Sequence, residues 1–360
     1  MQNKKAKLTA VLLISALLSI TLFIQPTSAV LIQNHTSWYL SDTSIASATI
    51  GDVDNDGAAE IVTGGYQNDG TRWTAQLVVW NGLTLAVKRA TSWYWISDTQ
   101  ITSVAVGDVD GDGGVEIVTG GAYFDNLRWV AQLVVWNGST LAVEKITSWN
   151  TTSNTQIASV ALGDVDGDGA SEVVTGGAYF DNTRYVAQLV VWNGSTFAVE
   201  NVQAWYWTST TEIASVVVGD VDGDGASEVV TGGSYFDNTR YNAQLVLWNG
   251  STLAVENQKT WYDIASNATI SSVSYGDIDN NGVVDVVTGG KYFDGVRWNA
   301  QITVQPGNTL LGNTGTNWYW TSDTYIEAIA VGSIGGINRI VTGGAFFDLS
   351  RANAQLTVWK

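Results

Sequence analysis

Apolar and polar positions alternate in short runs through most of this chain, a pattern typical of β-strands rather than helices. Small and branched side chains alternate in residues 101–106, which predicts a strand, followed by a polar loop and a second strand over residues 116–119. A third run covers residues 129–136, and an Asn-Gly pair, a strong hairpin signal, separates it from a fourth run over residues 140–148. The pattern therefore predicts a meander of four antiparallel strands, here named A to D.

The same unit recurs along the chain at a fixed period. Its polar loop reads Gly-Asp-Val-Asp-Gly-Asp-Gly-Ala-Ser-Glu at residues 163–172. Copies of this loop, of which the fifth is substituted and the sixth eroded, begin at Gly51, Gly107, Gly163, Gly219, Gly276 and Gly332. The spacings are 56, 56, 56, 57 and 56 residues, and a fixed period of this size is the signature of a repeat architecture. Six tandem units are therefore expected.

The polar loop of each unit has the composition of a cation site. In the third unit Asp164, Asp166 and Asp168 stand at alternate positions. Gly169 permits a sharp turn with positive φ, and Glu172 adds a fourth acid. Carboxylate oxygens curled round one centre, with a backbone carbonyl as a further ligand, suit the roughly six to eight oxygen ligands of calcium. The alternative interpretation is a solvated acidic β-turn, since Asp and Gly are ordinary turn residues.

Recurrence of the same residue types in five loops favours calcium over the ordinary turn. The last acid stands at position nine, so the loop is not an EF-hand. In the sixth unit Ser333, Gly335 and Gly336 replace the acids, so no ion is expected there, and Arg339 is a candidate substitute for the missing charge. We therefore expect about five Ca²⁺ ions. The candidate ligands are Asp52, Asp54, Asp56, Ala58, Glu60, Asp108, Asp110, Asp112, Gly114, Glu116, Asp164, Asp166, Asp168, Ala170, Glu172, Asp220, Asp222, Asp224, Ala226, Glu228, Asp277, Asp279, Asn281, Val283 and Asp285.

These loops and their flanks resemble a known repeat family. The stretch Val-Gly-Asp-Val-Asp-Gly-Asp-Gly-x-x-Glu-(Ile/Val)-Val-Thr-Gly-Gly, at residues 106–121 and 218–233, is similar to FG-GAP and VCBS type repeats. The resemblance covers nearly everything after residue 36 and implies a calcium-bearing β-propeller like the head of integrin α subunits. Val-Gly and Thr-Gly-Gly-Ala replace the family's Phe-Gly and Gly-Ala-Pro, and six repeats stand where integrins have seven. The resemblance therefore implies the fold and the metal rather than an integrin-like partner.

The two ends of the chain carry complementary parts of one repeat. Residues 37–40, Ser-Trp-Tyr-Leu, match the end of a repeat, as at residues 92–95, whereas residues 354–359 match a third strand. Pairing the N-terminal strand with the C-terminal blade would close the ring and remove exposed edges. The expected fold is all-β: a six-bladed β-propeller of four-stranded blades, closed by an N-terminal strand that joins the C-terminal blade.

The first 29 residues read as a targeting segment rather than as part of the fold. Three lysines within residues 4–7 precede an apolar run over residues 8–24, and Thr-Ser-Ala at residues 27–29 offers small residues to a signal peptidase. We therefore expect a signal peptide over residues 1–29 and the propeller over residues 30–360. The apolar run is long enough to span a bilayer, so the alternative is a retained membrane anchor. Either way the expected location is secreted, extracellular or at the cell surface.

Composition narrows the classes of partner. The chain has no Cys, so disulfides are excluded, and metal ions bound in the acidic loops would stabilise the fold in their place. The formal charge is −18, and 19 of the 34 acids lie in the five loops, so the acidity is mostly metal chemistry. Without a basic patch to neutralise phosphates, nucleic acid is excluded as a partner.

The chain contains six N-x-(Ser/Thr) sequons, three of them at one repeat position, and these are interpreted more simply as recurring turns than as glycan sites. They begin at Asn34, Asn137, Asn150, Asn193, Asn249 and Asn267.

The meander sorts its loops onto two faces. The A–B and C–D turns, and hence the calcium loops, share one face, and the B–C and D–A connections share the other. On this second face a Tyr-Phe-Asp-Asn-x-Arg turn recurs, in which an Asp stands three residues before an Arg. One interpretation is an ion pair within each hairpin tip; the other is a ligand surface of aromatic and polar groups. The candidate ligand-binding residues are Tyr123, Asp125, Arg128, Tyr179, Asp181, Arg184, Tyr235, Asp237 and Arg240.

The tryptophans at the ends of the C strands are expected to pack between blades. They are Trp80, Trp136, Trp192, Trp248 and Trp359.

The function that this sequence favours is a calcium-binding module for binding or adhesion to a glycan or an extracellular protein. A multivalent lectin, whose near-identical blades would give avidity, and a self-associating surface or scaffold protein are the alternatives. Enzymatic activity is not expected, because catalysis needs groups with different pKa values in one cleft, whereas this chain repeats the same groups around a ring. The residues that depart from the repeat near the second face include Glu212, Asp263 and Glu327, and a carboxylate pair among them is the alternative, for glycan cleavage.

Overall fold

The computed structural model describes residue 36 and residues 42–261, 267–312, 314–319, 322–348 and 351–359. The chain divides into two units, Met1–Ser37 and Trp38–Lys360, and nearly all the described residues belong to the second. The predicted signal peptide, residues 1–29, lies outside the described residues. Within the described part there is no helix of the length and hydropathy needed to cross a membrane.

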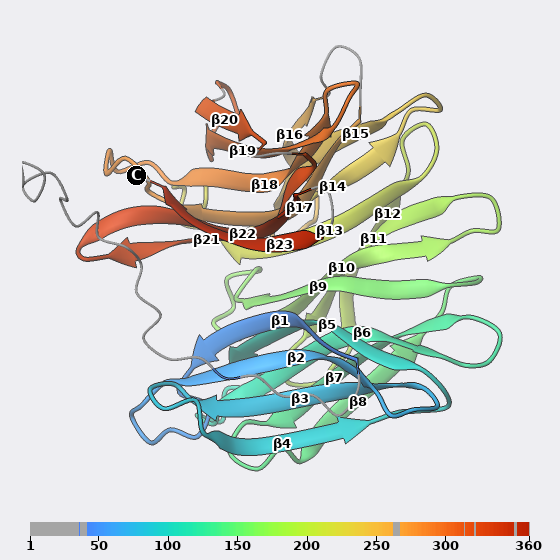
Figure 1. Cartoon of the computed structure of the whole chain (residues 1–360). Helices are drawn as coiled ribbons and strands as arrows, with labels where there is room; N and C mark the ends of the chain where they lie inside the picture. Colours follow the sequence, from blue (N-terminus) through green and yellow to red (C-terminus); the bar gives the residue numbers. More distant parts are fainter. Residues whose placement is uncertain are drawn as a thin grey trace, which may run out of the picture. The chain divides into compact units, whose positions relative to one another are not determined.

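The described residues form 23 β-strands in six antiparallel sheets, which are the blades of a six-bladed β-propeller (Figure 1). Blade one consists of β1 (Thr43–Gly51), β2 (Glu60–Asn68), β3 (Trp73–Asn81) and β4 (Val87–Trp93), in that order. Blade two contains β5 (Thr99–Gly107), β6 (Glu116–Phe124), β7 (Trp129–Asn137) and β8 (Val143–Trp149), and blade three contains β9 (Thr155–Gly163), β10 (Glu172–Phe180), β11 (Tyr185–Asn193) and β12 (Val199–Trp205). Blade four contains β13 (Thr211–Gly219), β14 (Glu228–Phe236), β15 (Tyr241–Asn249) and β16 (Val255–Trp261), and blade five contains β17 (Ala268–Gly276), β18 (Asp285–Phe293), β19 (Trp298–Pro306) and β20 (Thr314–Trp318). Blade six contains β21 (Thr324–Ile334), β22 (Ile337–Phe347) and β23 (Ala352–Trp359).

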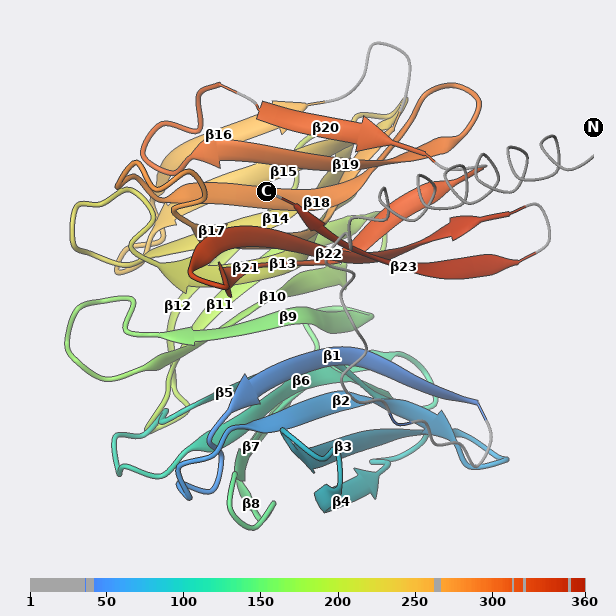
Figure 2. The same cartoon turned by 60° about the vertical axis from the view of Figure 1, so that its left-hand side comes forward.

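Blades one to five each pack their second and third strands against the first strand of the next blade (Figure 2). The Gly-Gly pair of the second strand permits two close approaches, the first glycine to the next blade and the second to the first strand of its own blade. A Cβ on Gly120 would stand 2.8 Å from Ile157 Cγ2 of the next blade, and one on Gly121 would collide with the carbonyl oxygen of Gln100. Strand B was predicted to end at these glycines, but β6 continues through them to Phe124. Tertiary packing, not a turn, therefore explains the pair.

Two polar contacts recur between neighbouring blades. The backbone N of Val104 donates to Ser47 Oγ at 3.1 Å, and Trp93 Nε1 donates to Gln132 Oε1 at 3.3 Å. The serine contact recurs at Val160–Ser103, Val216–Ser159, Val273–Ser215 and Ile329–Ser272. The Trp93 ring also packs on Trp136, with centroids 4.8 Å apart, and such aromatic contacts add to area burial. The predicted packing of the C-strand tryptophans between blades is confirmed for Trp136, Trp192, Trp248 and Trp359.

The junction between blades six and one differs from the other five. At the position of the bridging serine, blade six has Ala328. Ile45 of β1 is 50% exposed, whereas its counterpart Ile101 is 2% exposed. Around Gly343 of β22 no described atom lies within 4 Å of the position a Cβ would take. Blade six has three strands among the described residues, and the predicted closing strand at residues 37–40 lies outside them.

This difference gives a matched pair of glycine substitutions. Gly176→Ala places a Cβ 2.8 Å from Ile213 Cγ2 of the next blade, so it should lower the free energy of unfolding by about 1–3 kcal/mol through overpacking. Gly343→Ala, at the same repeat position, meets open space among the described residues and should be neutral or slightly stabilising. Urea unfolding measures both. Equal effects would contradict the assigned blade-to-blade packing.

Candidate metal sites and the opposite face

Five loops bring three carboxylates together, one loop in each of the first five blades. They are loop one (residues 52–60), loop two (108–116), loop three (164–172), loop four (220–228) and loop five (277–285). In each, ligand oxygens from the first, third and ninth positions lie within 4.8 Å of one another, which is the spacing of a metal site. The predicted convergence of these acids is therefore confirmed. The groups are Asp52, Asp54, Glu60; Asp108, Asp110, Glu116; Asp164, Asp166, Glu172; Asp220, Asp222, Glu228; and Asp277, Asp279, Asp285.

Backbone hydrogen bonds to the first aspartate fold each loop. In loop three Asp164 Oδ1 accepts from the N of Gly167 at 2.7 Å, and Asp164 Oδ2 accepts from the N of Gly169 at 2.9 Å. Gly169 has φ 89°, a conformation that favours glycine. Asp168, a predicted ligand, instead directs Oδ1 to the N of Ala170 at 2.8 Å and stands outside the group of three. Its counterparts in the other loops also lie outside the groups, so the core of each site has three acids rather than four.

The ninth acid begins the second strand and is buried. Glu172 is 1% exposed, and its Oε2 accepts from the N of Val165 at 2.8 Å. Burial, reinforced by the neighbouring aspartates, raises the pKa of Glu116, Glu172 and Glu228 to about 7. Burial likewise raises the pKa of Asp285. Buried carboxylates with raised pKa values next to further carboxylates form a set of hard oxygen donors that a divalent cation would stabilise.

Unsatisfied oxygens also fit a metal. Among the described residues, Asp54 Oδ1 and Asp110 Oδ1 are buried without a hydrogen-bond partner. Such an orphaned acceptor costs free energy unless a donor or a cation satisfies it. The donor set of all five loops contains oxygen and neither sulfur nor imidazole nitrogen, which favours calcium or magnesium over softer metals.

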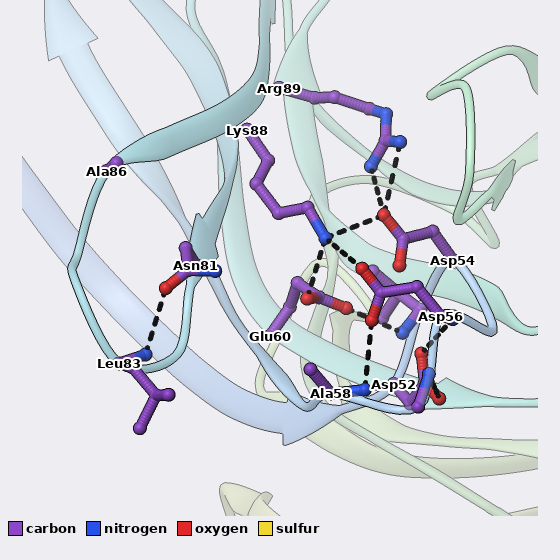
Figure 3. A network of polar contacts seen from close by, with 12 residues as sticks. Asp52, Asp54, Asp56, Ala58, Glu60, Asn81, Leu83, Ala86, Lys88 and Arg89 are labelled. Atoms are coloured by element: carbon purple, nitrogen blue, oxygen red, sulfur yellow. Dashed lines mark hydrogen bonds and ion pairs between the residues drawn. The ribbon is translucent and has the colours of Figure 1, made fainter.

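Loop one contains two basic side chains that the sequence analysis missed. Lys88 Nζ lies 2.8 Å from Asp54 Oδ2, 3.1 Å from Asp56 Oδ2 and 2.9 Å from Glu60 Oε1 (Figure 3). Arg89 Nη2 lies 3.3 Å from Asp54 Oδ2. The sequence did contain a signal for this difference: strand D of blade one has Lys88 where the next three blades have glutamate.

Blade six has a tight turn in place of the acidic loop. β21 and β22 pair as far as Ile334 and Ile337, joined by Gly335 and Gly336, both with positive φ. Arg339, the predicted substitute for the missing charge, pairs with Gly332 in the strand ladder.

On the opposite face the Asp–Arg pairs tie the hairpin tips. Arg184 Nε lies 3.7 Å from Asp181 Oδ2, and Asp181 Oδ1 accepts from the backbone N of Arg184 at 2.8 Å. These hydrogen bonds, led by that from the Thr183 hydroxyl, lower the pKa of Asp181. The ion-pair interpretation is thereby confirmed for five of the six hairpins, with N···O distances of 3.4–3.9 Å: Arg72–Asp69, Arg128–Asp125, Arg184–Asp181, Arg240–Asp237 and Arg351–Asp348.

The tyrosines proposed as ligand contacts are less accessible than expected. Tyr123 is 9% exposed, and Tyr179 and Tyr235 are half-buried. The most exposed aromatic side chains of this face come instead from the connections that follow the fourth strands. They are 41–54% exposed and comprise Tyr94, Trp95, Tyr206, Trp207 and Tyr319.

Among the described residues, the hairpin arginines hold the exposed tyrosines of blades one, three and five; the tyrosine at this position of blade four, Tyr262, lies outside the described residues. The guanidinium of Arg72 lies 4.3 Å from the ring centroid of Tyr94 in blade one. The same cation–π contact recurs in blades three and five: Arg184 on Tyr206 at 4.4 Å and Arg297 on Tyr319 at 4.3 Å. Blade two has Asn150 at the tyrosine position, and there Arg128 donates to the carbonyl oxygen of Thr152 at 3.2 Å. A Trp-Tyr-Trp triplet at residues 93–95, 205–207 and 318–320 was the sequence signal.

The described residues considered for catalysis stand on different blades. Glu212 stands on β13 of blade four and Glu327 on β21 of blade six, and blade five lies between these blades in the order of packing. Asp263 lies outside the described residues.

Comparison with known proteins supports the fold. No protein-family model matches this sequence, and no curated protein matches it. Among solved structures, the Dos1 propeller is similar with a TM-score of 0.50 and 13% identity, over 90% of this chain and 70% of that chain. Sqt1 of Chaetomium thermophilum has a TM-score of 0.44 and 15% identity, over 86% of this chain and 71% of that chain. At this identity the likeness to the Dos1 propeller shows the fold alone.

The raised pKa values predict how the stability of the metal-free chain depends on pH. Glu116, Glu172 and Glu228 have a pKa of about 7 when folded and an ordinary value of 4.5. They bind protons more tightly in the folded state, so the free energy of unfolding in chelator should fall as the pH rises from about 4.5 to about 7. The hairpin aspartates, with pKa values below 3.8, stay ionised throughout this window.

Urea unfolding in chelator at several pH values across this window tests the expectation. Replacing the three glutamates by glutamine should flatten the dependence. A wild-type stability that stays constant or rises over the window would contradict the assigned pKa values.

Proposed function

We propose that this chain is a secreted or cell-surface propeller of the FG-GAP/VCBS type, in which calcium ions hold the blades and the opposite face binds a glycan. The observation that carries the metal half of the proposal is the recurrence of a buried ninth acid beside two aspartates. Calcium suits this set because it accepts several carboxylate and carbonyl oxygens in flexible geometry, and the millimolar calcium outside cells would fill even weak sites.

The ligand half of the proposal rests on the exposed Tyr–Trp pairs of blades one and three and on the exposed Tyr319 of blade five. A sugar ring presents an apolar face of C–H groups and a rim of hydroxyls, so it fits flat aromatic surface beside hydrogen-bonding groups. Tyr206 and Trp207 supply the flat surface, and the Arg184 guanidinium fixes the Tyr206 ring. Beside them, the ionised Asp181 offers acceptor oxygens. Repetition on alternate blades would add avidity for a polymer with repeated sugars.

Calcium should stabilise the fold through loops two to five. Asp164→Ala with Asp166→Ala removes two of three clustered acids from loop three and should reduce the calcium-dependent rise in Tm. Ligand binding at about 100 times Kd is worth roughly 2.7 kcal/mol per site, so losing one site should lower Tm by several degrees in calcium but not in chelator. Ser333→Ala in blade six is the control and should leave Tm unchanged. The metal assignment fails if the wild-type Tm is the same in calcium and chelator.

Glycan binding should depend on the exposed aromatic pairs. Tyr206→Ala with Trp207→Ala should weaken binding to a polysaccharide several-fold, with a larger loss when Tyr94 and Trp95 are also replaced, because each platform contributes to avidity. Leu127→Ala removes another exposed side chain, at the hairpin tip of blade two, and should have no effect. Glycan arrays would find the sugar and calorimetry would measure its affinity. Binding that survives all four aromatic substitutions would exclude this surface, and binding only to proteins would exclude the glycan.

A further inference from the structure

Loop one departs from the other acidic loops at one position of strand D. Blades two to four have Glu144, Glu200 and Glu256 there, and blade one has Lys88. Each glutamate accepts a hydrogen bond from the asparagine that ends the third strand of its own blade, which keeps it engaged at the C–D turn. The distances are 2.9 Å for Asn137 Nδ2 to Glu144 Oε1, 2.8 Å for Asn193 Nδ2 to Glu200 Oε1 and 2.8 Å for Asn249 Nδ2 to Glu256 Oε1.

Lys88 instead points into the acidic cluster. Its ammonium contacts three carboxylates of loop one, those of Asp54, Asp56 and Glu60, all within 3.1 Å (Figure 3). Two of these acids, Asp54 and Glu60, belong to the group that could hold a metal. The Lys88 side chain is 22% exposed and that of Glu60 is fully buried. Hydrogen bonds to Asp54 and Glu60 raise the pKa of Lys88, so the ammonium is charged at any ordinary pH.

A cation in loop one would have to share this space with two positive groups. Arg89 also contacts Asp54, so two basic side chains face the four acids of the loop. A divalent ion bound between Asp54 and Glu60 would lie close to the Lys88 ammonium, and like charges at a few ångströms repel strongly where water is largely excluded. Binding would therefore require Lys88 to leave all three carboxylates. The carboxylate oxygens of loop one are suitable metal ligands, but the two basic side chains that contact them disfavour a metal ion there.

Loop two shows that a nearby lysine alone does not have this effect. Lys145, which occupies the position of Arg89, contacts Asp110 at 3.2 Å and the carbonyl oxygen of Gly194 at 3.3 Å. Among the described carboxylates it pairs only with that of Asp110, so its charge is directed at one edge of the cluster. Loops three and four have Asn201 and Asn257 at this position.

We propose that Lys88 is a built-in cation that keeps loop one free of metal, so that the chain binds four calcium ions, in loops two to five. The inference rests on the proposed calcium function. Blade one would then hold its first hairpin by internal ion pairs, independently of the calcium concentration, while the four following blades respond to it.

Ion counting by native mass spectrometry of the purified chain in calcium tests this proposal. The wild type should hold four ions. Lys88→Glu restores the residue of blades two to four, with Asn81 placed like Asn137 to engage it, and should raise the count to five. Lys259→Gln is the control and should keep four, because this lysine on β16 donates to the carbonyl oxygens of Leu310 and Gly312.

Each outcome separates the inference from the proposed function. Five ions in the wild type would overturn the role of Lys88 and leave the calcium function standing, whereas no ions would overturn the calcium function itself. Four ions in both the wild type and a folded Lys88→Glu chain would also overturn the inference. If Lys88→Glu does not fold, Lys88→Met removes the ammonium without adding an acid: five ions would support the proposal and four would overturn it.

Discussion

Repulsion among carboxylates that are crowded into the first hairpin of each blade is the constraint on which this structure depends. The ninth acid of each loop opens a strand and is buried, so it cannot move into solvent without disrupting that strand. The aspartates beside it are fixed by backbone hydrogen bonds, as Asp164 is by Gly167 and Gly169. Negative charge at this density needs a counter-charge. The acidic loops offer oxygen donors that could hold a divalent cation, and in loop one the Lys88 ammonium contacts them. In blade six the acids themselves are absent and a tight turn takes their place.

The same hairpins set the geometry of the opposite face. In blades one to five, each first strand leads from a connection on one face to an acidic loop on the other. It also carries the serine that accepts a hydrogen bond from the next blade. Rigid blades fix the hairpin tips. There the arginine guanidinium lies over a tyrosine on blades one, three and five, and on blades one and three it also pairs with the hairpin aspartate. The acidic loops and the exposed aromatic side chains thus lie at opposite ends of one repeated unit, so the proposed calcium and glycan sites would be linked through the stability of the blade.

Much of this architecture could be predicted from the sequence, because the repeat made each weak local signal recur. The period placed the strands, the six blades, the acid clusters and the tryptophans between blades. Features that depend on contacts between repeat units were harder to predict from the sequence. The Gly-Gly pair resembles a turn, but Ile157 of the next blade and the Gln100 carbonyl of the neighbouring strand explain it. Lys88 and the alternate Tyr–Trp triplets were visible as departures from the repeat, yet their meaning depends on which side chains face them. Tyr123 looked like a surface residue because the burial of a hairpin flank is set by tertiary packing.

Hydrogen exchange of the backbone amides, followed by mass spectrometry with calcium and with chelator, tests the central claim most directly. The account predicts that calcium slows exchange in loops two to five, residues 108–116, 164–172, 220–228 and 277–285. Loop one, residues 52–60, and the blade-six turn, residues 333–338, should exchange at the same rate in both conditions. Equal exchange of all six segments with and without calcium would contradict the account.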